Sequence, residues 1–199
     1  MKTGIIVLIV IVFVALILIA SVIGTYNTLN RNYQAVRSGE SQYSAELNNC
    51  TQKIQGVWEI ANQYMNHESE TFQSVTLARS GYDVARKDFE NAKDLKSQTQ
   101  AGNSAVNAAL AFQLQVEAYP QLQAVETTRE NIRNMESSVN EIKTALNDWI
   151  VTIRTYNTYR GSFWPNILGS MMGKFPSEMA YYEGEVKKLD INQLNPQKE

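Results

Sequence analysis

The sequence predicts an all-α protein in which an N-terminal transmembrane helix is followed by an antiparallel bundle of long helices. Three observations predict it. Residues 5–23 form an uncharged apolar run. After that run, apolar residues recur at alternating steps of three and four, which is typical of a helix with one buried face. Alternating strand patterns are scarce, and the first of the four prolines is Pro120, so residues 25–119 lack the strongest helix breaker.

The apolar run has the length of a membrane span. As a helix, its 19 residues rise about 1.5 Å each, and the resulting length matches the hydrocarbon thickness of a bilayer. Lys2 before the run also fits a cleaved signal peptide, but the run exceeds the usual 7–15-residue apolar region and lacks a clean A-x-A cleavage site. We therefore expect an uncleaved single-pass anchor at residues 1–24, a helical bundle domain at 25–187 and a polar flexible tail at 188–199.

The charge pattern argues against a nucleic-acid partner. The chain has 18 basic and 20 acidic residues, and the two signs alternate along residues 79–96, which is typical of a solvated helix surface. Around the anchor, Lys2 lies on one side and Arg31 and Arg37 on the other, so the positive-inside rule gives a near tie for orientation.

Two apolar seams define the predicted first half of the bundle. The first continues the anchor helix without a break, and near Glu68 its register slips, which indicates either a bend or a helix end. The second seam follows the slip and ends at Phe89. The first comprises Tyr33, Val36, Tyr43, Leu47, Cys50, Ile54, Val57, Ala61 and Tyr64; the second Val75, Ala78, Tyr82, Ala85 and Phe89.

The second half of the bundle begins with a predicted connection at residues 97–104, where polar residues and a glycine show no apolar spacing. A short helix follows at 105–119, and a long helix runs from Leu122 to Tyr156, ended by Gly161 and Pro165. Residues 163–172 form a short amphipathic segment. The seams face each other within one chain, or pair between molecules as a homo-oligomeric coiled coil.

Candidate chemistry is sparse. His67 and Glu68 supply two metal ligands where zinc sites need three or four, so we expect no metal and no cofactor. The single cysteine, Cys50, excludes an intrachain disulfide. Nucleophile-elbow, phosphate-loop and dinucleotide motifs do not occur, and we therefore expect no enzyme.

An aromatic cluster late in the chain is the best candidate for a ligand patch or a membrane-interface belt, because Trp and Tyr favour places with one apolar and one wet side. The alternative is bundle core plus an end cap. A methionine pair beside it either binds a partner or packs onto the bundle. The candidate residues are Trp149, Tyr156, Tyr159, Phe163, Trp164, Met171 and Met172.

A series of short motifs in order along the chain resembles the LemA family of membrane-anchored bacterial proteins. Each motif is weak alone, and the ordered series covers nearly the whole chain. The matching positions are Tyr26, Asn27, His67, Glu68, Ala78, Arg79, Tyr119, Pro120, Glu136, Tyr156, Asn157 and Pro165.

The chain departs from the family pattern at residues 49–57, where the family usually carries R-R-x-D-L-I-P-N-L. The family's proline there implies a kink or helix break near Gly56. Thr25 stands where some relatives carry a lipoprotein cysteine, so lipidation is not expected. The resemblance implies a membrane-anchored bundle without established enzymatic activity, leaning extracytoplasmic.

Two functional hypotheses follow. The first is a structural or protein-interaction module at the bacterial envelope, whose partner is a membrane or envelope protein or a second copy of the chain. The second is a membrane-tethered sensor that binds an apolar or lipid-like ligand near the aromatic cluster.

Overall fold

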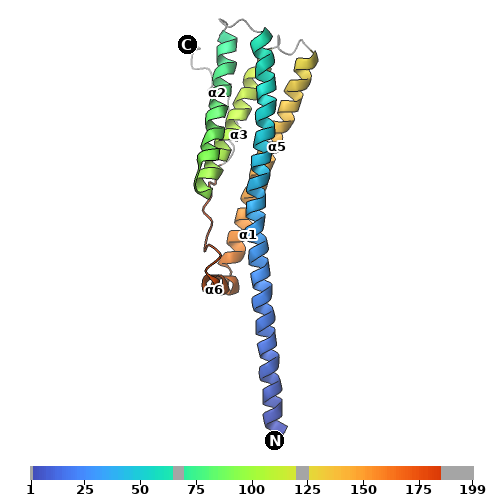
Figure 1. The fold of residues 1–199 in the computed structure, drawn as a ribbon, viewed down its shortest axis with the longest axis vertical. Helices are drawn as coiled ribbons and strands as arrows, with labels where there is room; N and C mark the ends of the chain where they lie inside the picture. The colour runs from blue at the N-terminus through green and yellow to red at the C-terminus, as the bar shows by residue number, and fades with distance from the viewer. Residues whose placement is uncertain (1, 65–69, 120–125, 185–199) are drawn as a thin grey trace. The chain divides into compact units, whose positions relative to one another are not determined.

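The computed structural model describes residues 2–64, 70–119 and 126–184, and five α-helices fall within them (Figure 1). They are α1 (Lys2–Tyr64), α2 (Glu70–Asn91), α3 (Leu95–Glu117), α5 (Glu126–Gly161) and α6 (Phe163–Met172). The helices pack antiparallel, so the predicted all-α bundle with a long apolar N-terminal helix is confirmed.

The contacts of the chain fall into two units. Unit 1 comprises Met1–Ser38 and Val151–Met179, and unit 2 comprises Gly39–Ile150 and Ala180–Glu199. The helices α1 and α5 contribute to both units, whereas α2 and α3 belong to unit 2 and α6 to unit 1. Each unit has buried residues of its own.

The core of unit 2 is built from the predicted seams. Along α1 the seam residues from Tyr43 to Ala61 are buried, and the seam of α5 is buried from Ile132 to Trp149. Spacings of three and four place such residues on one helix face, and facing stripes bury one another in a bundle. The buried residues of these stripes are Tyr43, Leu47, Cys50, Ile54, Val57 and Ala61 on α1, and Ile132, Met135, Val139, Ile142, Leu146 and Trp149 on α5.

Residues 97–104 are helical, so the predicted connection there is wrong. The chain turns at residues 92–94, where Asp94 caps α3 by accepting a hydrogen bond from the Ser97 N–H at 2.9 Å. Thr99, Gly102 and Asn103 are buried on the inner face of α3. The segment looked like a loop because its inner face is made of small polar residues rather than apolar ones.

Unit 1 contains the apolar run, whose large side chains from Ile5 to Ile19 are 48–63% exposed. Within the described residues, α1 is the one helix long and apolar enough to cross a membrane, which makes it a candidate anchor or signal sequence. After α5 ends at Gly161, Ser162 precedes α6, and Gly173 with φ 63° ends α6 in the left-handed conformation. Pro165 lies in the first turn of α6, where a backbone N–H has no helical partner.

Two further predictions concerned helix boundaries. The α1 helix is continuous through Gly56, so the helix break implied by the family's proline is wrong. Gly56 keeps its N–H, and glycine in a helix costs only about 1 kcal/mol relative to alanine. The register slip predicted near Glu68 falls between α1, described up to Tyr64, and α2, described from Glu70. His67, Glu68, Pro120 and the predicted tail lie outside the described residues.

Candidate functional site

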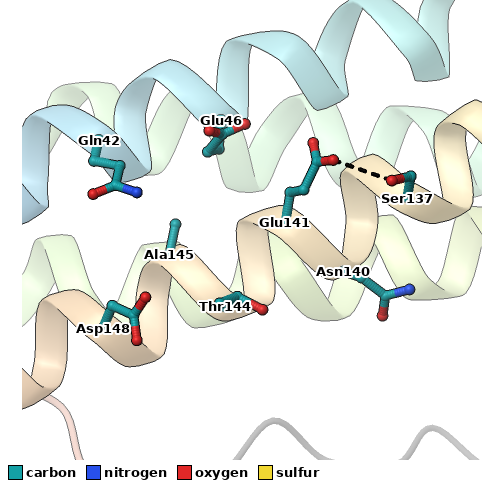
Figure 2. Close-up of a pocket in the computed structure, with 8 residues that line it drawn as sticks. All are labelled: Gln42, Glu46, Ser137, Asn140, Glu141, Thr144, Ala145 and Asp148. Atoms are coloured by element: carbon teal, nitrogen blue, oxygen red, sulfur yellow. Dashed lines mark hydrogen bonds between the residues drawn. The ribbon is translucent and has the colours of Figure 1, made fainter.

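A polar groove runs between α1 and α5 on the surface of unit 2 (Figure 2). Glu46 on α1 and Glu141 on α5 lie on facing helices across it. The Glu141 carboxylate accepts a hydrogen bond from the Ser137 hydroxyl at 3.1 Å and another from the Asn49 side chain at 3.4 Å. The lining residues are Gln42, Glu46, Ser137, Asn140, Glu141, Thr144, Ala145 and Asp148.

The groove is lined by hydrogen-bonding and acidic side chains. It is open, with a volume of about 310 Å³, and its lining offers carboxylates, amides and hydroxyls but neither histidine nor cysteine. A general base or nucleophile with a tuned pKa is what acid–base or covalent catalysis needs. Within residues 2–64, 70–119 and 126–184, no group of three or more His, Cys, Asp or Glu side chains is arranged to hold a metal ion.

The most strongly perturbed titratable groups of unit 2 lie in the core. Burial raises the pKa of the Cys50 thiol to about 12 and also raises the pKa of Tyr43 and Tyr82. The Tyr82 hydroxyl donates to the Leu47 carbonyl at 3.1 Å and lies 2.9 Å from the Thr51 hydroxyl. These groups stay neutral because they are buried, and the hydrogen bonds of Tyr82 join α2 to α1.

Trp149 and Tyr156, the first two candidate residues of the aromatic cluster, are completely buried. In unit 2, Trp149 stacks on Tyr43 with ring centres 5.9 Å apart and meets the edge of Phe89 at 6.3 Å. In unit 1, the Tyr156 ring lies edge-on to Tyr33 at 6.2 Å, and its hydroxyl donates to the Pro176 carbonyl at 2.6 Å.

The other candidate residues lie in unit 1 with widely different exposure. Tyr159 borders a shallow surface groove of about 540 Å³ formed by α1 and α5. Phe163 and Met171 are 80% and 79% exposed. Trp164 is half-buried, and its indole N–H donates to the Ser21 hydroxyl at 2.8 Å. Met172 is also half-buried.

A buried arginine that the sequence analysis did not single out organises the corner between α5 and α6. Arg160 is 2% exposed, and its guanidinium donates to the backbone and side-chain carbonyls of Asn166 at 3.0 and 2.9 Å and to the Ser170 hydroxyl at 3.2 Å. Gly169 packs against the guanidinium so closely that an added Cβ would lie 2.8 Å from Nε. The sequence feature that could have indicated the burial of Arg160 is its position four residues after Tyr156, on the buried stripe of α5.

Asn157 fixes the segment after α6. Its amide donates to the Met179 carbonyl at 2.9 Å, and its carbonyl accepts from the Met179 N–H at 2.8 Å. This two-way pairing imitates a backbone pair, so a single side chain holds a stretch without regular structure. Burial raises the pKa of neighbouring Tyr156, against the opposing effect of the Arg160 charge.

A sequence profile of the LemA family matches residues 40–192, which is most of the chain. The chain belongs to the LemA family. No curated protein matches it. The resemblance seen in the short motifs is therefore confirmed, and the LemA match begins after the apolar run.

The LemA motif positions in unit 1 make local contacts near the end of the apolar run. The Lys174 ammonium donates to the Asn30 side chain at 3.2 Å and to the Tyr26 hydroxyl at 3.4 Å, and lies over the Tyr26 ring. Asn27 is exposed, and Pro165 is buried in the first turn of α6.

In unit 2, the LemA positions on α2 and just after α3 contact other helices. The Arg79 guanidinium lies 4.1 Å from the Trp58 ring centre and 3.8 Å from the Asp83 carboxylate. The Tyr119 hydroxyl lies 3.0 Å from that of Ser74. Ala78 is half-buried on α2.

Glu136, the LemA position on α5, lies close to a second carboxyl. Its pKa is raised, first by burial and then by the charge of Glu117 on α3, with which it also hydrogen-bonds. Gln113 donates to Glu117 at 2.7 Å, which holds that carboxylate in place. Like charges this close disfavour the state in which both carboxyl groups are ionised, so the hydrogen-bonded pair favours one proton between them.

Proposed function

We propose that this LemA family protein is a membrane-anchored interaction module that presents the surface of its helical bundle to another membrane or envelope protein, without catalytic activity of its own. The observation that carries the proposal is the continuity of α1. One helix, Lys2–Tyr64, carries both the apolar run and the seam that is buried in the core of unit 2. A chain built in this way keeps a folded surface close to a bilayer.

Two faces of unit 2 are candidates for the contact with a partner. On α2, Leu77 and Val84 are 72% and 56% exposed and lie two turns apart, with Gly81 between them. Exposed apolar side chains at helical spacing are typical of a surface that accepts a partner helix. The second face is the polar groove of Figure 2, which offers hydrogen-bonding groups and negative charge.

Site-specific photo-crosslinking in native membranes tests the proposal. A photo-reactive residue is placed at Leu77, at Thr144 in the polar groove, and at Gln52, an exposed α1 residue outside both faces. We expect a crosslinked product from Leu77 or Thr144 and not from Gln52. A product with twice the mass of the chain would identify a second copy as the partner. Equal yields at all three positions, or only monomer throughout, would contradict the proposal.

For the compartment, we propose that the bundle lies outside the cytoplasm, as the LemA resemblance implies. Protease should then digest unit 2 when it is added to cells whose outer layers have been removed and whose cytoplasmic membrane is intact. In inverted membrane vesicles the same residues should be protected. The reverse pattern would place the bundle in the cytoplasm and change the class of partner to be sought.

A further inference from the structure

The outward face of α6 is apolar in a protein whose other surface helices are mostly polar outside. Phe163, Ile167 and Met171 are 80%, 40% and 79% exposed and follow one another at intervals of four, which places them on one face. The opposite face of α6 is buried through Pro165, Leu168 and Gly169. Apolar residues therefore lie on both faces of the helix, and the exposed polar residues Asn166 and Ser170 beside them are hydrogen-bonded to Arg160.

The position of α6 along α1 supplies the reason. The Trp164 indole donates to Ser21, which lies within the last three residues of the apolar run. If residues 5–23 span the hydrocarbon layer, Ser21 lies at its edge. Within unit 1, Figure 1 shows α6 nearly end-on while α1 runs along the vertical, so α6 crosses α1 rather than running beside it. A helix transverse to a membrane span lies along the membrane plane.

The groups around α6 are those of a membrane interface. Lys174 is the second residue after α6 and reaches Tyr26 and Asn30, which lie about 7.5 and 13.5 Å farther along α1 than Ser21 at 1.5 Å per residue. Its ammonium also lies 5.4 Å from the ring centre of Phe175. Tryptophan and tyrosine at the boundary, with a lysine above it, form the usual order of side chains from hydrocarbon to headgroups.

The charge of unit 1 fits an anionic lipid surface. Beyond the apolar run this unit has five basic residues and one acidic residue, whereas the whole chain has a net charge of −2. Basic residues close to a membrane surface are attracted to anionic lipid headgroups. The residues counted are Arg31, Arg37, Arg154, Arg160 and Lys174 against Glu178.

From these observations we infer that α6 is an interfacial helix, which lies in the headgroup boundary of the bilayer that α1 spans and buries Phe163, Ile167 and Met171 among the acyl chains. The inference rests on the proposed anchoring by α1. Unit 1 then contacts the membrane through two helices, α1 across the bilayer and α6 at its surface, rather than through α1 alone.

Fluorescence quenching in vesicles tests this placement. The full chain with Cys50→Ala is reconstituted in phosphatidylcholine–phosphatidylglycerol vesicles, and a fluorophore is attached to a single new cysteine. The positions are Val12 in the apolar run, Met171 on α6, and Thr155, an exposed α5 residue in unit 1. Quenchers are a doxyl-labelled lipid and aqueous iodide. Because Met171 and Thr155 are both exposed, labelling should leave the helix content unchanged.

We expect doxyl quenching at Met171 to be several-fold stronger than at Thr155, and iodide quenching several-fold weaker. Iodide quenching at Met171 equal to that at Thr155 would overturn the inference. Protection of Met171 from both quenchers would overturn it as well, because another protein surface would then cover α6. Val12 reports the anchor separately. If Val12 is not quenched by the lipid probe, the proposed anchoring fails; if only Met171 is not, the interfacial placement alone fails.

Discussion

The Tyr43 hydroxyl donates to the backbone carbonyl of Gly102 at 2.9 Å, and the Tyr43 ring lies where a Cβ at position 102 would come within 3.3 Å. The hydrogen bond joins α1 to α3 across 59 residues of chain. Glycine is favoured there by the tight space rather than by backbone conformation, since Gly102 has no positive φ. This close approach sets the distance between two helices of unit 2.

Gly102→Val should therefore destabilise the bundle. The added branches meet the Tyr43 ring and a Leu146 methyl, and overpacking of this kind costs about 1–3 kcal/mol. Gly81→Ala on α2 is the matched control, because nothing lies within 4 Å of its added Cβ and the helix gains about 1 kcal/mol of propensity. Urea unfolding of both variants measures the difference. A stable Gly102→Val variant would contradict the close approach.

Ile142→Asp should unfold the bundle. Ile142 is fully buried on the α5 seam, and an unpaired carboxylate there costs more than about 4 kcal/mol. Its neighbour Glu141 is exposed at the groove, so Glu141→Ala should change the free energy of unfolding by less than about 0.5 kcal/mol. Circular dichroism during thermal unfolding checks both. Equal tolerance at the two positions would show that the seam is assigned to the wrong face.

The Cys50 thiol should be inert in the folded protein. It is completely buried with a pKa raised to about 12, and only the thiolate reacts with disulfide reagents or alkylating agents. At pH 8 we expect no labelling until denaturant is added. A cysteine introduced at exposed Ser80 should label at once under the same conditions. Rapid labelling of Cys50 in the native state would require that α1 and α2 separate readily.

Glu136 should make the bundle less stable as pH rises. Its pKa is higher in the folded protein than in the unfolded chain, so the folded state binds more protons in the window between the two values. Stability is therefore lost as pH rises through the raised pKa. Glu136→Gln removes the charge and should raise the melting temperature at pH 7 more than at pH 4. Glu130→Gln, at an exposed position on the same helix, should give no such difference.

The bundle was predictable from the sequence wherever apolar residues alone formed the buried face. The seams of α1 and α5 were found because most buried positions carry an apolar residue, as from Ile132 to Trp149, where Ser138 is the buried polar exception. The start of α3 was missed because Thr99, Gly102 and Asn103 form its buried face, and such residues usually indicate a turn. Asp94 is a typical N-cap residue, but it could be assigned as a cap only once a helix was known to start at Leu95.

The corner between α5 and α6 was less predictable, because its central residue is of a type that usually lies at the surface. Arginine is rarely buried, so the role of Arg160 in holding α6 could not be read from composition. The amphipathic segment at residues 163–172 was expected, but which of its apolar residues point outward depends on how Trp164 meets Ser21. Spacing within one segment carries no information about a partner some 140 residues away.

The contact between Tyr43 and Trp149 has a consequence for synthesis of the chain. When α1 leaves the ribosome, the partner that covers its seam is still about 100 residues from being made, which at 5–20 residues per second is at least about 5 s. During the first part of that interval the apolar stripe of α1 lacks both α3 and α5, and until its end it lacks α5. The nascent chain is thus exposed to aggregation during synthesis, and a holding chaperone would act on this stripe first.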